Sequence, residues 1–232
     1  MSPRSTGRVL IFDADDTLWE NNVLFERVID DFLDWLEHPT LDRADLRAVL
    51  NDIETANTAV HGYGSKVFLR SLRDCFERLN ERPTTERERR RINELAVALV
   101  EHRVELVPGV AETLLDLGTR HRLLLLTKGD QAEQRRKLDA SQLAHHFDGI
   151  HIVPEKDITA YLRLAEEHAL TPASTWMIGN SPKSDIIPAR QAGMNAVLIP
   201  NAHTWVLEQA ALDPGDRGVL TLRAFPELLD HF

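Results

Sequence analysis

Four groups of polar residues each follow a short apolar run, and their side chains are of the types that bind cations and anions. The groups are Asp13 with Asp15, Thr127 with Lys128, Lys156, and the segment 180–185. One polar group after an apolar run is commonly a helix cap, but four in succession are hard to explain as caps alone. Carboxylates can hold a metal ion, and a lysine beside that ion can make a pocket attractive to an anion. The pattern therefore indicates a site for a cation and a small anionic substrate.

The apolar runs are typical of buried strands in a parallel sheet. They cover residues 9–12, 123–126, 150–153, 176–178 and 196–199, with a further candidate at 218–222. Helical patterns lie between the later runs, and strands that alternate with helices predict an α/β fold with a doubly wound parallel sheet. Because ligands bind at the carboxyl ends of such strands, we expect the four polar groups to meet at one edge of the sheet.

The segment between the first two strands follows a different pattern. Apolar residues between about 18 and 103 recur at helical spacing, which predicts about four helices and no strand. Pro108 and Gly109 mark the return to the alternating pattern. The sequence therefore predicts a core domain from residues 1–17 and 104–232, interrupted by a helical domain at 18–103.

The first motif is the most specific. Residues 13–17 read Asp-Ala-Asp-Asp-Thr and match the pattern DxDxT. With Thr127, Lys156 and the segment 179–185, the chain resembles the haloacid dehalogenase-like (HAD) superfamily of hydrolases, in the subfamily with a helical C1-type cap inserted after this motif. The resemblance covers nearly the whole chain. It implies a Rossmann-like core, a helical cap at 18–103 and Mg²⁺ as cofactor.

The resemblance also implies catalytic roles. Asp13 would be the nucleophile that forms an aspartyl-phosphate, and Asp15 would be the general acid and base. Asp15 would have to start protonated, so we expect nearby carboxylates to raise its pKa. Lys156 would neutralise Asp13 and the phosphoryl group. Lys137 is discounted as this lysine because it lies within a predicted helix.

Three residues are candidates for substrate binding. Thr127 matches the second motif and would donate a hydrogen bond to a phosphoryl oxygen. Lys128 could add a phosphate contact, although a solvent-facing lysine is the more common arrangement. Asn21 lies just beyond the first motif, where the core meets the cap, and could bond the substrate.

The expected metal ligands are Asp13, the backbone carbonyl of Asp15, and either Asp185 or Asn180. The fourth motif usually carries two acids, and here Asn180 replaces the first while Asp185 is kept. An amide oxygen can also coordinate Mg²⁺, but without charge. Asp16 stands where the family most often has glycine, and the sequence offers no account of it.

These residues favour a Mg²⁺-dependent phosphatase that hydrolyses a small soluble phosphomonoester. A 2-haloacid dehalogenase of the same fold is an alternative that Asn180 favours slightly, but such enzymes lack the second aspartate of the first motif. A phosphomutase and a non-catalytic binding protein of this fold also stay open.

Composition limits the partners. The net charge of −10 argues against sequence-independent binding to nucleic acid. The longest plain apolar run, 123–126, is far too short to span a membrane. One cysteine, Cys75, allows no intramolecular disulfide, so a cytoplasmic location is expected. We expect a monomer or a homodimer.

Overall fold

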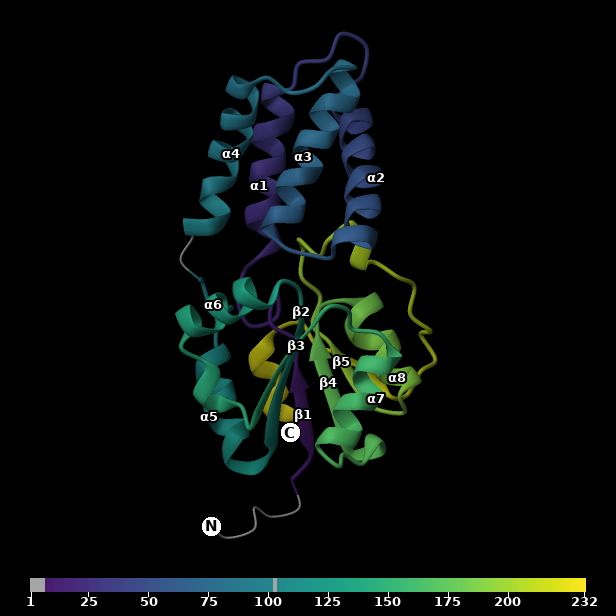
Figure 1. Ribbon diagram of the computed structural model, residues 1–232. Coiled ribbons are helices and arrows are strands. Elements are labelled where there is room, and N and C mark those ends of the chain that lie inside the picture. Colours follow the sequence, from purple (N-terminus) through teal and green to yellow (C-terminus); the bar gives the residue numbers. More distant parts are fainter. Residues whose placement is uncertain (1–6, 102–103) are drawn as a thin grey trace. The chain divides into compact units, whose positions relative to one another are not determined.

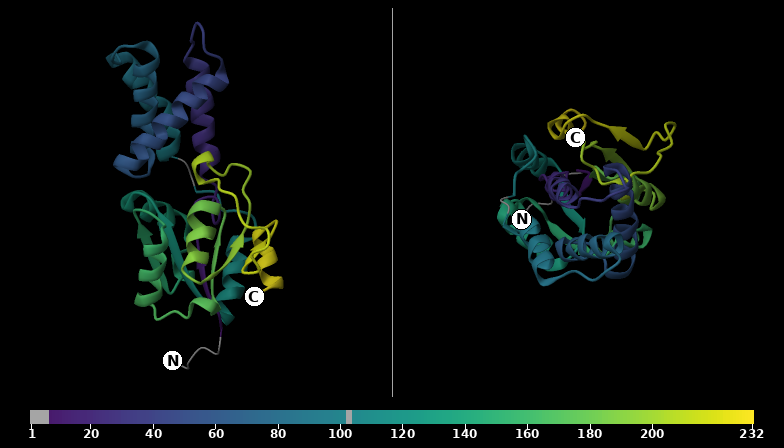
Figure 2. Two further views of the ribbon diagram at one scale, coloured as in Figure 1. Left: turned by 90° about the vertical axis from the view of Figure 1, so that its right-hand side faces the viewer. Right: turned by 90° about the horizontal axis from the view of Figure 1, so that it is seen from above.

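The computed structural model describes residues 7–101 and 104–232, which form two compact units. Residues 7–22 and 104–232 make up the sheet unit, and residues 23–101 make up the helical unit. Figures 1 and 2 show both units, and each is described here by itself.

The sheet unit contains six parallel strands in the order β3-β2-β1-β4-β5-β6. The strands are β1 (Val9–Phe12), β2 (Arg122–Lys128), β3 (Gly149–Val153), β4 (Thr175–Gly179), β5 (Asn195–Leu198) and β6 (Val219–Thr221). The predicted doubly wound parallel sheet is confirmed. β1 lies at the centre, so its side chains are covered on both faces, which is why the run 9–12 is continuously apolar.

Helices cover both faces of this sheet (Figure 1). They are α5 (Val110–Arg120), α6 (Gln131–Ser141), α7 (Ile158–Glu167) and α8 (Ile187–Gln191). Leu10 and Phe12 of β1 pack in one apolar core with α5 and the 3₁₀ segment Phe225–Asp230. Ile11 faces the other way and packs with α7 and α8. The alternation follows from the two-residue period of a strand.

The helical unit consists of four helices packed around their own apolar core. They are α1 (Asn22–Trp35), α2 (Arg43–His61), α3 (Ser65–Asn80) and α4 (Glu86–Glu101). Phe32, Leu50 and Leu72 are fully buried in this core. Asp42 caps α2 in a capping box with Asp45, which satisfies backbone N–H groups that the helix leaves unpaired. No helix among residues 7–101 and 104–232 has the length and apolarity to cross a bilayer.

The division between the units falls after Asn22, five residues later than the sequence pattern suggested. Leu18 and Trp19 explain this position, because both are buried in the apolar core of the sheet unit. Trp19 also forms a β-bridge with Leu106, where the chain returns to the sheet unit.

Candidate active site

The carboxyl ends of three central strands place the polar groups together. β1 ends at Phe12, so Asp13 is the first residue beyond it, and its N–H still bonds to Ile178 of β4 at 2.9 Å. β2 ends at Lys128 and β4 ends at Gly179. Because all the strands are parallel, the residues that follow them share one edge of the sheet.

Lys156 joins two carboxylates at this edge. Its ammonium group donates hydrogen bonds to Asp13 Oδ1 and to Asp185 Oδ1, and all three residues are buried. Burial by itself would lower the pKa of Lys156, but the charges of Asp13 and Asp185 raise that pKa well above its ordinary value. Lys156 is therefore a fixed positive charge between two acids that come from different strands.

Asp13 has a second contact on its other oxygen. The hydroxyl of Thr17 lies 3.1 Å from Asp13 Oδ2 and 3.3 Å from Asn180 Oδ1. A hydroxyl has one proton and can donate to only one of these oxygens at a time. Burial raises the pKa of Asp13 to about 7, with the Asp185 charge adding to the rise and Lys156 opposing it. Asp13 Oδ2 and Asn180 Oδ1 therefore lie near the same hydroxyl, and at least one of them can accept a further contact. A positive charge at this point would stabilise the buried Asp13 carboxylate.

Asp185 has both oxygens occupied. Oδ1 accepts from Lys156, and Oδ2 accepts from the N–H of Ser181 at 2.9 Å. Its carboxylate lies so close to Gly179 that a Cβ at that position would come within 2.2 Å of Oδ2. Glycine is required there because it leaves room for the acid. Asp185 lies in a π-helical turn, Pro182–Ile186, that leads directly into α8.

Asp15 differs from the sequence-based expectation. Its carboxylate accepts from Trp19 Nε1 and Gln134 Nε2, each at 2.7 Å, and from Lys137 Nζ at 3.0 Å. Burial alone would raise the pKa of Asp15, but the Lys137 charge and these hydrogen bonds outweigh it and lower that pKa. The expectation of a raised pKa is wrong for this arrangement, because Asp15 faces a lysine and not another acid.

Lys137 is a second lysine of the site, although Lys156 and not Lys137 is the lysine beside Asp13. Lys137 lies on α6, and its ammonium group bonds both to Asp15 and to Asn21 Oδ1, the latter at 2.7 Å. Gln134 and Lys137 are three residues apart and so share a helix face. α6 begins just after β2 ends, so the face that carries these two residues could have been expected near the polar edge of the sheet. Asn21, a predicted substrate contact, is thus a neighbour of the Asp15 cluster.

Asp16 has a structural role that the sequence did not reveal. Its backbone is in the left-handed region with φ of 61°, which explains why glycine is common at this position of the family. Its carboxylate accepts from the N–H groups of Asn21 and Asn22, each at 2.9 Å. The side chain therefore caps the chain where α1 begins.

Lys128 is held by a buried acid and is not solvent-facing. Lys128 Nζ donates to Glu208 Oε1 at 2.6 Å and to Ser184 Oγ at 2.8 Å. The other oxygen of Glu208 accepts from Ser181 Oγ and Ser184 Oγ, each at 2.6 Å. Thr127, next to Lys128 on β2, is buried at the same edge. Glu208 thus connects β2 to the 181–185 turn through hydrogen bonds. No sequence pattern pointed to Glu208, because it is an isolated acid in a short 3₁₀ turn.

A family model matches most of the chain. Residues 8–193 match the model of the haloacid dehalogenase-like hydrolases. The chain belongs to this family. The match includes Asp13, Lys156 and Asp185, so these acids and the lysine between them belong to the part of the fold that the family shares. A search of curated proteins finds no significant match.

Solved structures of the family have the same fold. A haloacid dehalogenase-like family hydrolase from Xanthomonas campestris is 26% identical with a TM-score of 0.80, and the alignment covers 97% of this chain and 95% of that one. A 2-haloacid dehalogenase from Pseudomonas syringae is 19% identical with a TM-score of 0.62, and a HAD hydrolase from Bacillus subtilis bound to magnesium is 17% identical with a TM-score of 0.66. Each of these two alignments covers 97% of both chains. Similarity at this level establishes the hydrolase fold, and the substrate must be argued from the residues.

Proposed function

We propose that this hydrolase is a Mg²⁺-dependent phosphatase that acts on a small soluble phosphomonoester through an aspartyl-phosphate on Asp13. The observation that carries the proposal is the position of Lys156 between Asp13 and Asp185. A phosphoryl group in transfer carries its charge on three equatorial oxygens, and a fixed, buried ammonium group beside the attacking carboxylate stabilises that charge.

The oxygens near Asp13 fit a hard cation. Asp13 Oδ2 and Asn180 Oδ1 both lie within hydrogen-bonding distance of the single Thr17 hydroxyl, so they face a common point. Asn180 Nδ2 donates to Thr204 Oγ1 at 3.1 Å, which orients the amide oxygen toward Asp13. Oxygen ligands are those that Mg²⁺ prefers. We assign Asp13, Asn180 and the Asp15 backbone carbonyl as ligands. Asp185 is assigned as the acid that holds Lys156, because its second oxygen accepts from the Ser181 N–H, whereas that of Asp13 shares the Thr17 hydroxyl with Asn180.

Mg²⁺ bound there would neutralise charge on Asp13 and on the phosphoryl oxygens. The residues of the chain carry out the two steps. In the first, the Asp13 carboxylate forms a bond to phosphorus, the bond from phosphorus to the alcohol oxygen breaks, and that oxygen takes a proton from Asp15. In the second, water attacks phosphorus and gives a proton to Asp15, the bond to Asp13 breaks, and inorganic phosphate leaves.

Asp15 supports a phosphate ester over a haloacid as substrate. An alkoxide leaving group needs a proton, whereas a halide does not, so a second acid has a chemical purpose with a phosphate ester and none with a haloacid. Lys137 keeps Asp15 anionic in the free protein, as the second step needs. The negative charge of an entering phosphate would raise the pKa of Asp15 and favour the proton that the first step needs. Thr127 and Lys128 are the proposed contacts of the phosphoryl group.

The test is release of p-nitrophenol from p-nitrophenyl phosphate, with and without Mg²⁺. We expect Mg²⁺-dependent release by the full chain and none by Asp13→Asn. Asp139→Asn is the matched control, because Asp139 is an exposed acid on α6 and should leave the rate unchanged.

Other outcomes would identify the alternatives. Halide release from 2-chloropropionate without metal would overturn the phosphatase in favour of a dehalogenase. Transfer of phosphate within a sugar phosphate, without release, would indicate a mutase. No reaction across a broad panel of phosphate esters would indicate a binding protein.

A further inference from the structure

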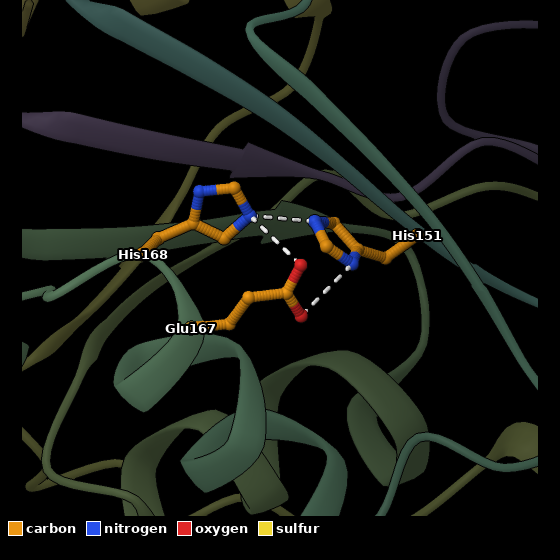
Figure 3. Close-up of side chains that lie close together, drawn as sticks. All are labelled: His151, Glu167 and His168. Carbon is orange, nitrogen blue, oxygen red and sulfur yellow. Dashed lines mark hydrogen bonds and ion pairs between the residues drawn. The ribbon is translucent and has the colours of Figure 1, made fainter.

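Three side chains of types that can ligate a metal ion lie close together on the sheet unit (Figure 3). His151 is on β3, Glu167 is the last residue of α7 and His168 follows it. The two His Nε2 atoms are 2.7 Å apart, and the Glu167 carboxylate lies 3.8 Å from His151 Nδ1 and 4.0 Å from His168 Nε2. We call these three residues the His–Glu–His cluster.

The fold brings the cluster together at the far end of α7. This helix begins beside Lys156 and runs for ten residues, so its last turn lies about 15 Å from that lysine. Gly149 on β3 leaves space for the ring of His168, since a Cβ there would come within 2.9 Å of His168 Cε1. The His168 ring is therefore packed against the strand that carries His151, and the cluster is separate from the phosphate site.

The donor atoms suit a transition metal. Imidazole nitrogens favour Zn²⁺, Ni²⁺ and Cu²⁺ over Mg²⁺. One ligand atom from each residue can be chosen so that all three lie within 4.8 Å of one another, and ligands around a tetrahedral Zn²⁺ ion lie about 3.3 Å apart. The side chains of His151 and His168 are 18% and 13% exposed, whereas Glu167 is 63% exposed. The two rings are mostly covered and need to separate slightly to hold an ion between their Nε2 atoms, while the exposed carboxylate can move toward it.

One neighbour opposes metal binding. Arg122 donates a hydrogen bond to His168 Nδ1 and another, at 3.1 Å, to the His168 carbonyl. A guanidinium group can only donate, so His168 Nδ1 must be the acceptor and His168 Nε2 must carry the proton that it donates to His151. A metal on Nε2 needs the other tautomer, with its N–H directed at Arg122. Metal-ligating histidines normally direct that N–H at an acceptor.

We propose that His151, Glu167 and His168 bind one Zn²⁺ or Ni²⁺ ion, which replaces the hydrogen bond between the two rings, and that Arg122 limits the affinity. The bound ion would join β3 to the end of α7. An ion that binds the folded chain alone would raise its melting temperature.

The experiment is calorimetric titration of the untagged full chain with ZnCl₂ and with NiCl₂, in excess Mg²⁺ so that oxygen-rich sites are filled. We expect one site per chain and a rise in melting temperature. His151→Gln and His168→Gln should each weaken binding by 10-fold or more, and Arg122→Gln should tighten it by about 10-fold, since a glutamine can offer an acceptor to the N–H of His168.

The matched control is the double variant His145→Gln, His146→Gln, which removes a neighbouring pair of histidines outside the cluster. It should bind the ions as the unchanged chain does. Binding that is lost in this control and kept in His151→Gln, or no binding at all, would overturn the site. Weaker binding by Arg122→Gln would overturn the proposed role of Arg122. The tighter binding that we expect for Arg122→Gln can be measured even if His168→Gln does not fold.

Discussion

Lys137 Nζ lies 3.0 Å from each carboxylate oxygen of Asp15, although the two residues are 122 positions apart in the chain. Lys156 Nζ also bonds to an aspartate of this motif, but it contacts only Oδ1 of Asp13 and is shared with Asp185. Asp13 and Asp15 thus contact different lysines, Lys156 from the segment after β3 and Lys137 from helix α6. The proposed nucleophile, Asp13, and the proposed acid and base, Asp15, therefore have different electrostatic surroundings.

Replacing Lys137 should slow catalysis without preventing binding. In Lys137→Met the carboxylate of Asp15 loses its charged partner and one of the contacts that orient it. We expect kcat for p-nitrophenyl phosphate to fall about 10- to 100-fold with little change in KM, because a misplaced Asp15 loses part of the roughly 10²–10⁴-fold that general acid and base catalysis contributes. Arg136→Met, an exposed change on the same helix, should be neutral. Equal kcat in the two variants would show that Lys137 does not position Asp15.

Glu208 and Lys128 should stabilise the sheet unit as a pair. Their side chains are 11% and 13% exposed, and Glu208 also accepts from two serines. Glu208→Gln leaves the lysine charge poorly compensated, so we expect the free energy of unfolding to fall by about 1–3 kcal/mol in urea titrations. The double variant with Lys128→Met should lose less than the sum of the two single variants. Strict additivity would mean that the two residues act independently.

Gly179 should tolerate no side chain. The added Cβ of Gly179→Ala would lie 2.2 Å from Asp185 Oδ2 and 2.4 Å from Asp185 Cγ, so the carboxylate that holds Lys156 must move. We expect a loss of about 1–3 kcal/mol in unfolding free energy and a large loss of phosphatase activity. Gly118→Ala is the control, because Gly118 is inside α5 and its nearest neighbour would be 3.7 Å away. Gly118→Ala should be neutral or stabilising by up to about 1 kcal/mol.

Cys75 should be unreactive in the folded protein. It is fully buried in the helical unit, and burial raises the pKa of its thiol to about 12. Thiolate is the reactive form, so iodoacetamide at pH 8 should modify the native chain very slowly and the urea-unfolded chain rapidly. Cys75 is the only cysteine, so mass spectrometry of the product reports on this residue alone. Rapid labelling of the native chain would contradict the buried position.

The thiol of Cys75 should make the free energy of unfolding depend on pH in the alkaline range. Its folded pKa, about 12, lies above the ordinary value of 9.0, so the folded state favours the neutral form. This contribution is fully present below pH 9 and is lost as the pH rises from about 9 to about 12. The free energy of unfolding should therefore fall more steeply over that range in the unchanged chain than in Cys75→Ala. Parallel curves for the two proteins would exclude this contribution.

The sequence alone determined the sheet and the order of its polar groups. Short apolar runs separated by helical patterns identify buried parallel strands by local periodicity, and the residues after such strands must meet at one edge. This is why Asp13, Lys156 and Asp185 could be expected together before their contacts were known. The family resemblance then supplied their proposed roles.

Only the tertiary structure decided which charges are partners. Lys137 contacts Asp15, Glu208 contacts Lys128, and His151 contacts His168, across 122, 80 and 17 positions of the chain. Each contact depends on where a long side chain reaches after two elements have packed, and no local pattern encodes that reach. The pKa of Asp15 follows from these contacts. For this reason the sequence could identify the carboxylate and could not predict the direction in which its pKa is shifted.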